Sequence, residues 1–159
     1  MARTSRSAAA APAARQPARK PARKTATPSA EARMLAAIRQ SQAFATFATD
    51  GSLLDANEPF CRALGYALDE IRGRHHGLFT EPGEAAGHEH RALWDRLVAG
   101  EHDAAQYKRV GKGGREVWLQ ASYSPVPGAD GRPEAIVLLG TGISAQVQGA
   151  HDIARVLGA

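Results

Sequence analysis

The most constraining feature of the chain is residues 50–73, where turn, cap and apolar residues follow one another in a fixed order. Asp50 and Gly51 form a dipeptide typical of a tight hairpin turn, so we expect one strand before it and another after it. Asn57 is a favoured helix N-cap and Gly65 a favoured helix terminator, so a short helix is predicted between them.

The rest of the chain predicts further helices and three more strands. The predicted helices are residues 30–42, 57–64, 67–72, 88–100 and 145–157, and the predicted strands are residues 43–49, 52–56, 104–111, 116–125 and 134–142. The longer helices follow from apolar residues at helical spacing, and the strands from alternating segments that end in glycine-rich turns. Residues 75–87 are expected to be irregular. Two strands, then helices, then three strands predict an α+β domain with one antiparallel sheet and helices on one face.

Several short motifs resemble those of PAS sensor domains over about residues 42–145. In chain order they are Asp-Gly at 50–51, Ala-Asn at 56–57, Gly-Tyr at 65–66, Glu-Ile-Arg-Gly at 70–73, Lys-Gly-Gly at 112–114 and Val-Trp at 117–118. The resemblance is closest to the PAS modules of bacterial chemoreceptors and aerotaxis-type redox sensors. It implies a PAS fold: a five-stranded antiparallel sheet with short helices and one longer helix covering a cavity, between flanking N- and C-terminal helices. One departure is Gly-Ile-Ser at residues 142–144, where the family often has Asp-Ile-Thr.

The charge of the chain is unevenly distributed. Residues 1–28 hold seven of the 20 Lys and Arg residues and no acid, which leaves 13 basic against 16 acidic residues in the remainder. A tail of Ala, Pro, Arg and Lys cannot bury apolar surface, so we expect it to be disordered. It is either a solvated extension or a weak binding element for nucleic acid or another polyanion. The expected organisation is a basic tail (1–28), a flanking helix (29–42), a PAS sensor domain (43–144) and a C-terminal signalling helix (145–159).

Motifs for catalysis, phosphate binding and zinc binding are not found in the sequence, so no enzymatic activity is expected. No run approaches the roughly 18 apolar residues that a membrane span needs. The single cysteine, Cys61, excludes an internal disulfide and fits a reducing compartment, so we expect a cytoplasmic protein in which Cys61 is a small buried hydrophobic residue.

The resemblance also raises the question of a flavin cofactor. Light-sensing PAS relatives bond flavin through a cysteine after Gly-Arg-Asn, whereas residues 73–76 read Gly-Arg-His-His, so this adduct is not expected. Redox-sensing aerotaxis receptors bind flavin adenine dinucleotide (FAD) without that cysteine, and they carry a histidine at the position of His76 and a tryptophan at that of Trp94. An aromatic ring can stack on the isoalloxazine and a histidine can hydrogen-bond to its edge. The resemblance thus implies an FAD site made of His76, Trp94, His75 and Asn57.

Two alternatives to flavin stay open. Oxygen-sensing PAS domains hold haem iron through one helix-borne histidine, and His76, His88 or His90 is available as the ligand of a haem b. In the other alternative, Trp94 packs in the core, the histidines hydrogen-bond locally, and the cavity is empty or holds a small metabolite. Residues 80–83 read Thr-Glu-Pro-Gly in place of the receptors' Arg-His-Pro-Asp, which weighs against a simple transfer of their flavin site.

Two functional hypotheses follow from the sequence. The first is a non-enzymatic cytoplasmic sensory module for redox, oxygen or energy taxis. Its flanking helices, each with an apolar stripe, would pair in a homodimer and pass a rearrangement to a downstream signalling protein or domain. The second is a nucleic-acid-associated protein that binds through residues 1–28 and uses the PAS domain as its dimerisation module.

Overall fold

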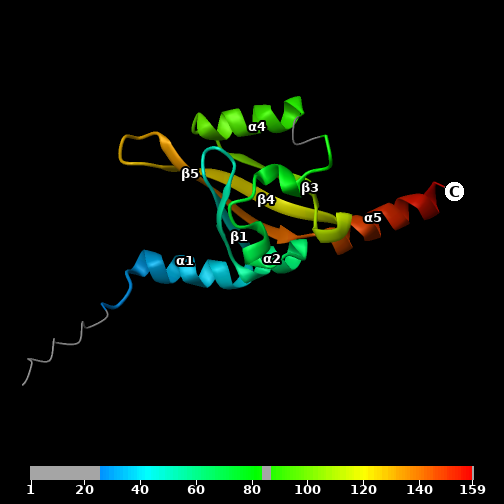
Figure 1. Cartoon of the computed structure of the whole chain (residues 1–159). Helices are drawn as coiled ribbons and strands as arrows, with labels where there is room; N and C mark the ends of the chain where they lie inside the picture. The colour runs from blue at the N-terminus through cyan, green and yellow to red at the C-terminus, as the bar shows by residue number, and fades with distance from the viewer. Residues whose placement is uncertain (1–25, 84–86, 159) are drawn as a thin grey trace, which may run out of the picture.

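A computed structural model describes residues 26–83 and 87–158. In these residues a five-stranded antiparallel sheet lies at the centre and helices surround it (Figure 1). The predicted basic tail, residues 1–28, lies outside the described residues except for its last three positions.

The order of the elements along the chain confirms the predicted fold class. The strands are β1 (Ala43–Phe47), β2 (Leu53–Ala56), β3 (Asp103–Val110), β4 (Glu116–Pro127) and β5 (Pro133–Gly142). The helices are α1 (Ala30–Ser41), α2 (Glu58–Leu64), α3 (Leu68–Ile71), η1 (His76–Phe79), α4 (His88–Val98), η3 (Lys112–Gly114) and α5 (Ser144–Leu157), of which η1 and η3 are 3-10 turns. The strands lie in the order β2-β1-β5-β4-β3, and every neighbouring pair is antiparallel.

The predicted turn between β1 and β2 depends on Gly51. Its φ is +91°, a left-handed conformation that glycine adopts without strain. A Cβ at this position would lie 2.6 Å from Nε2 of His75, so a larger residue would also collide with that ring. The Asp50 carboxylate accepts the backbone N–H of Ser52 (2.9 Å) and closes the turn.

The core lies on one face of the sheet because alternate residues of each strand point the same way. In β4 the inward residues are Val117, Leu119, Ala121 and Tyr123, and all are buried. Phe60 and Leu64 of α2, Phe79 of η1 and Leu97 of α4 join them from the helical side. Helices and sheet therefore share one hydrophobic core.

Some element ends differ from the predicted ones for local reasons. Helix α4 ends at Val98 rather than at residue 100, because Gly100 adopts a φ of +98° that no helix continues. Strand β4 runs on to Pro127, because Val126 still pairs with Ala135 of β5. Cys61, predicted to be buried, is half-buried on α2 and packs against the edge of the core.

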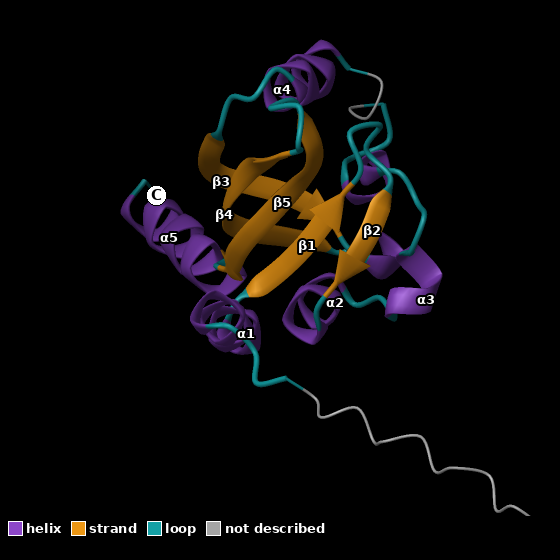
Figure 2. Cartoon of the chain, turned by 90° about the vertical axis from the view of Figure 1, so that its left-hand side faces the viewer, coloured by secondary structure: helices purple, strands orange, loops and turns teal. Residues whose placement is uncertain are grey.

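The two flanking helices contribute little to this core. Neither α1 nor α5 has a buried residue, and both carry exposed apolar side chains: Met34, Leu35 and Ile38 on α1, and Ile153, Val156 and Leu157 on α5. Ala43 at the start of β1 pairs with Gly140 near the end of β5, so α1 ends and α5 begins at the same end of the sheet. In Figure 1, α1 lies to the left of this end of the sheet and α5 to its right. In Figure 2, α4 lies above the sheet and both flanking helices lie toward its lower left.

No helix in the described part of the chain is long and apolar enough to cross a membrane.

Candidate functional site

His76 is the most deeply buried of the residues that the sequence predicts for a site, with 1% of its surface exposed. It is the first residue of η1, and its backbone N–H donates to the Gly51 carbonyl (2.8 Å). The preceding residue, His75, forms a bridge with Ser52 and accepts the Gly77 N–H on Nδ1 (3.0 Å). These bonds fix the segment to the β1–β2 turn and place the His76 ring in the core.

Both ring nitrogens of His76 are hydrogen-bonded within the protein. Nδ1 lies 2.8 Å from Nε2 of His90 on α4, and Nε2 lies 2.9 Å from the hydroxyl of Tyr123 on β4. The same hydroxyl accepts a hydrogen bond from Nη2 of Arg109 on β3 (3.0 Å). We call this series, His90–His76–Tyr123–Arg109, the polar chain. It connects η1, α4, β4 and β3 through the interior of the domain.

The environment keeps His76 neutral. Burial is the main cause that lowers its pKa well below 6.5, and the charges of Arg109, His90 and His75 act in the same direction. Burial also raises the pKa of the Tyr123 hydroxyl, although Arg109 opposes that shift. A neutral imidazole has one donor and one acceptor nitrogen. The polar chain therefore has two proton arrangements, which differ in whether His76 donates to His90 or to Tyr123.

Aromatic rings enclose His76. Trp94 lies 5.1 Å from it between ring centroids, and Phe47 also lies 5.1 Å away, edge on. Trp94 stacks on His90 (6.3 Å, 7° between planes), and its Nε1 donates to the Thr49 carbonyl (2.8 Å). The predicted residues His75, His76, His90 and Trp94 thus come together, and Trp94 is half-buried at the edge of this group.

The interior beside His76 leaves little room for a cofactor. The void there, lined among others by Phe60, His76, Leu119 and Tyr123, has a volume of about 10 Å³, which is the space of about one water molecule. An isoalloxazine or a haem does not fit in a void of this size. A bond from haem iron to His76 would also replace one of its two hydrogen bonds. In this conformation the residues present fit neither FAD nor haem b, and both stay predictions.

A larger hollow opens on the other side of the polar chain. It is a groove of about 610 Å³ between α4, the segment after η1, and β3, lined among others by Pro82, His88, Leu93, Tyr107 and Arg109. His90, at one end of the polar chain, and Arg109, at the other end, both line it. His88, the third predicted haem ligand, lies exposed at the first position of α4, away from the His76 ring.

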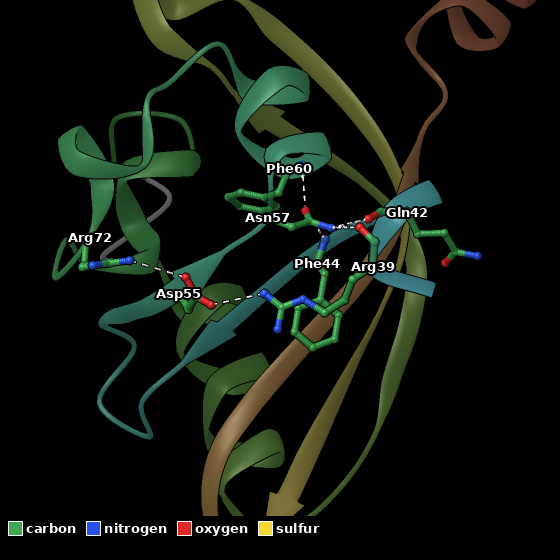
Figure 3. A network of polar contacts seen from close by, with 7 residues as sticks. All are labelled: Arg39, Gln42, Phe44, Asp55, Asn57, Phe60 and Arg72. Atoms are coloured by element: carbon green, nitrogen blue, oxygen red, sulfur yellow. Dashed lines mark hydrogen bonds and ion pairs between the residues drawn. The ribbon is translucent and has the colours of Figure 1, made fainter. Parts of the chain in front are cut away.

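Asn57 is placed elsewhere, at the junction of α1, β1 and α2 (Figure 3). Its Oδ1 accepts the backbone N–H of Phe44 (2.9 Å) and of Phe60 (3.0 Å). Its Nδ2 donates to the carbonyls of Arg39 and Gln42, both at 2.7 Å. Asn57 is thus the N-cap of α2 that the sequence predicts, and in addition it holds the end of α1. Its amide is fully used by the protein and does not face the His76 group.

An ion pair reinforces the same junction. Asp55 of β2 lies 3.2 Å from Arg39 of α1 and 3.6 Å from Arg72, which follows α3 (Figure 3). The Arg39 guanidinium also lies 4.6 Å above the ring centroid of Phe44. These side chains are partly exposed, so each pair adds little stability by itself. Together they connect the end of α1 with β1, β2 and the residue after α3.

Sequence reasoning did not select Tyr123 or Arg109 for the site. Tyr123 has the same strand parity as Val117, Leu119 and Ala121, so alternation alone places its ring in the core. A buried tyrosine hydroxyl needs a partner, and a histidine is an obvious one. Arg109 gave no such signal, because an arginine in a strand normally points to solvent.

Among the residues that the structure describes, no group of three or more His, Cys, Asp or Glu is arranged to hold a metal ion.

Comparison with known proteins gives a consistent family. Residues 39–148, more than half of the chain, match the family model described as PAS fold. The biofilm dispersion protein BdlA of Pseudomonas aeruginosa is 38% identical over 125 residues. That match covers 79% of this chain and 30% of BdlA, so the chain spans under a third of that relative.

Solved structures agree with this fold at low sequence identity. An RNA-binding Light-Oxygen-Voltage receptor superposes with a TM-score of 0.65 at 20% identity, covering 87% of this chain and 40% of the receptor chain. A PAS domain from Colwellia psychrerythraea gives 0.62 at 15% identity, covering 72% of this chain and 98% of that one. A domain of a sensory box sensor histidine kinase/response regulator from Geobacter sulfurreducens gives 0.57 at 22% identity, covering 69% and 92%.

Proposed function

Because the chain belongs to the PAS fold family, we propose that it is a non-enzymatic sensory module that passes a change near His76 to its flanking helices. The observation that carries the proposal is that two strands join the polar chain to those helices. β1 runs from α1 to the ring of His76, and β4 runs from the polar chain to the start of α5.

The path along β1 begins at the Phe47 ring, which contacts His76. At the other end of this short strand, the Phe44 N–H donates to Asn57, which also binds the last carbonyls of α1. A shift of the Phe47 ring therefore has a short route to the end of α1. This five-residue strand is paired with β2 on one side and with β5 on the other.

The path along β4 begins at Tyr123, whose hydroxyl binds His76. Farther back on the strand, the Trp118 N–H donates to the hydroxyl of Ser144 (3.0 Å), and its carbonyl accepts the Ile143 N–H (2.9 Å). Ser144 is the first residue of α5. These two hydrogen bonds fix the start of α5 to the sheet. They lie at residues 142–144, where PAS domains often have Asp-Ile-Thr and this chain has Gly-Ile-Ser.

The output in this proposal is a homodimer formed by α1 and α5, acting on a downstream signalling protein. Both helices expose apolar side chains that the sheet does not cover, and amphipathic helices of this kind commonly pair between protomers. The signal is a shift between two arrangements of the paired helices. The resemblance to chemoreceptor modules supports a setting in taxis, and the relationship to BdlA supports one in biofilm dispersion. The proposed location is the cytoplasm.

The oligomer is tested by light scattering during gel filtration. Ile38→Glu on α1 and Val156→Glu on α5 place a charge in the exposed apolar stripes, and we expect each to convert a dimer to a monomer. Leu54→Glu is the matched control, because Leu54 is an exposed leucine on β2, outside both helices. A monomeric wild-type protein would contradict the dimer, as would a dimer that only Leu54→Glu dissociates.

The sequence leaves three inputs open: redox or oxygen sensing through FAD, the same sensing through haem b, or a small metabolite. The void of about 10 Å³ beside His76 favours the third. Absorbance of the freshly purified full chain distinguishes the three inputs. Flavin bands in the blue or a haem Soret band identify the first two, and a colourless folded protein from flavin- and iron-replete cells favours the third.

The nucleic-acid alternative depends on residues 1–28, which lie almost entirely outside the described residues, and it stays a prediction. Binding that falls steeply with salt and is lost on deletion of this segment would support it.

A further inference from the structure

The groove between α4 and β3 has the features of an anion-binding site. We propose that it binds an organic carboxylate, whose charged group pairs with Arg109 and the N-terminus of α4 and whose apolar body lies along Leu93, Pro82 and Tyr107. This inference rests on the proposed sensory function, because it names the chemical class of the molecule sensed.

Arg109 carries most of the argument. Its side chain lies in the interior, with only 8% of the residue exposed, and it lines both the groove and the void beside His76. It donates to two neutral acceptors, the Lys108 carbonyl (3.0 Å) and the Tyr123 hydroxyl (3.0 Å). Its Nε is buried and has no hydrogen-bond partner among the described residues.

Within residues 26–83 and 87–158, the charge of this guanidinium has no carboxylate partner, although nine ion-pair contacts between other residues are present. The Tyr107 ring, 4.8 Å from the guanidinium carbon, offers only a weak cation–π contact. A buried cation without a counter-ion is costly, and a carboxylate bound in the groove would supply both the charge and an acceptor for Nε.

The start of α4 provides a second, independent attraction for an anion. This helix has 11 residues, and its N-cap, Gly87, has no side chain to satisfy the first-turn N–H groups. Gly87, His88 and His90 all line the groove, so the positive end of the helix dipole faces the same space as Arg109. α4 lies above the sheet in Figure 1.

Of the described residues that line the groove, two are carboxylates, Asp103 and Glu89. Asp103 accepts hydrogen bonds from Arg96 (3.2 Å) and Tyr107, so its charge is already paired. Glu89, in the first turn of α4, has no ion pair among the described residues and would repel a bound anion. The volume of about 610 Å³ is far larger than a single inorganic ion, which favours an organic molecule.

Occupancy of the groove also has a direct connection to the polar chain. A carboxylate on Arg109 competes with the Tyr123 hydroxyl for the same guanidinium. Tyr123 then shifts its hydrogen bonding toward His76, which in turn changes the bond between His76 and His90. The ligand and the output paths thus meet at one side chain.

Isothermal titration of the full chain tests the site with probes that separate charge from shape. The probes are 1-naphthoate, its uncharged amide 1-naphthamide, and inorganic phosphate. We expect saturable binding of naphthoate, at least about tenfold weaker binding of naphthamide, and weaker binding of phosphate than of naphthoate. Equal affinity for naphthoate and its amide would overturn the charge pairing, and tighter binding of phosphate would replace the organic acid with a phosphate ligand.

Two variants test whether Arg109 attracts the carboxylate of naphthoate and Glu89 repels it. Arg109→Gln should weaken naphthoate binding by about tenfold or more and leave naphthamide unchanged, whereas Arg115→Gln, on the turn after β3 and outside the groove, should change neither. Glu89→Gln, which does not depend on the buried arginine for folding, should tighten naphthoate binding and leave the amide unchanged. Unaltered naphthoate affinity in either Arg109→Gln or Glu89→Gln would overturn the assignment.

The outcome is separable from that of the sensory proposal. A wild-type chain that dimerises through α1 and α5 but binds neither naphthoate nor phosphate overturns the anion site and leaves the sensory module standing. A chain that binds naphthoate through Arg109 but stays monomeric supports the site and contradicts the proposed output.

Discussion

The domain contains two interior polar networks that contrast in how completely they are satisfied. At the Asn57 junction, one amide makes four hydrogen bonds to backbone groups of three elements, and no polar atom of that side chain is left over. The polar chain instead ends at Arg109, where a buried Nε has no partner among the described residues and the charge has no counter-ion there. The Asn57 network has a single arrangement of hydrogen bonds. The polar chain has two, because His76 can donate to either His90 or Tyr123.

This difference matches the roles proposed for the two networks. A satisfied network holds its elements rigidly, since any movement would break hydrogen bonds that nothing replaces. An incompletely satisfied network loses little when it rearranges, and it gains when a ligand supplies the missing partner. In the proposed sensor, the polar chain rearranges when a ligand binds, and the rigid Asn57 network passes that change to α1.

The largest effect is expected when the satisfied network is broken. Asn57→Ala removes one side chain but leaves two N–H groups and two carbonyls without their partner, and it removes the N-cap of α2. We expect the free energy of unfolding to fall by about 3 kcal/mol. Urea denaturation followed by circular dichroism measures it, and hydrogen exchange should show α1 loosened first.

Asn57→Asp is the matched control for this change. It keeps the oxygen that accepts from Phe44 and Phe60 but loses the donor to Arg39 and Gln42. We expect a smaller loss, about 1 to 2 kcal/mol. If Asp costs as much as Ala, the donor half of the amide holds the junction and the cap contributes little.

The polar chain should tolerate the loss of a link somewhat better. Tyr123→Phe leaves His76 Nε2 and one Arg109 N–H without their shared partner in the core. We expect a loss of about 2 kcal/mol, because Arg109 retains the Lys108 carbonyl and the ring still fills its place. Tyr66→Phe is the control, since the Tyr66 ring packs against Phe79 but its hydroxyl forms no hydrogen bond among the described residues. Equal stability of the two variants would show that the Tyr123 hydroxyl contributes nothing.

The sequence predicts the Asn57 cap of α2 better than it predicts the polar chain, but it does not predict the link from Asn57 to the end of α1, and the family resemblance assigns Asn57 to a flavin site instead. Helix capping depends on neighbouring residues only. The sequence around Asn57 and Gly65 is therefore enough to predict both ends of α2. The polar chain joins residues from η1, α4, β3 and β4, which meet only after the sheet has formed. The family resemblance assigns His76 and Trp94 to a flavin site. His90 is a candidate because histidine is a common haem ligand. Arg109 was missed because its burial depends on packing that no local pattern encodes.

The pH dependence of stability offers a finer measure of the polar chain. The pKa of folded His76 lies well below its ordinary value of 6.5, so below that pH the unfolded chain binds a proton that the folded chain excludes. Stability should therefore be complete above pH 6.5 and decrease as the pH falls, by up to about 1.4 kcal/mol per pH unit for this residue. The difference in slope between wild type and His76→Gln reports on His76 together with His90, to which it is hydrogen-bonded. His151→Gln, on the exposed α5 and outside the polar chain, is the control, and an equal change of slope in both variants would remove His76 from the cause.

The smallest expected effect is at Trp94, on the border between the polar chain and the β1–β2 turn. Trp94→Phe keeps a ring against His76 and His90 but loses the hydrogen bond from Nε1 to the Thr49 carbonyl. At this half-buried site we expect a loss of about 1 kcal/mol. Trp118→Phe, which loses an exposed bond to Glu116, should cost within about 0.5 kcal/mol. A comparison of Trp94→Phe with Trp94→Ala separates two roles of Trp94. A flavin held by stacking would stay bound in the phenylalanine variant and be lost in the alanine variant. Retention of flavin in the alanine variant would mean that Trp94 fixes the turn and does not contact the cofactor.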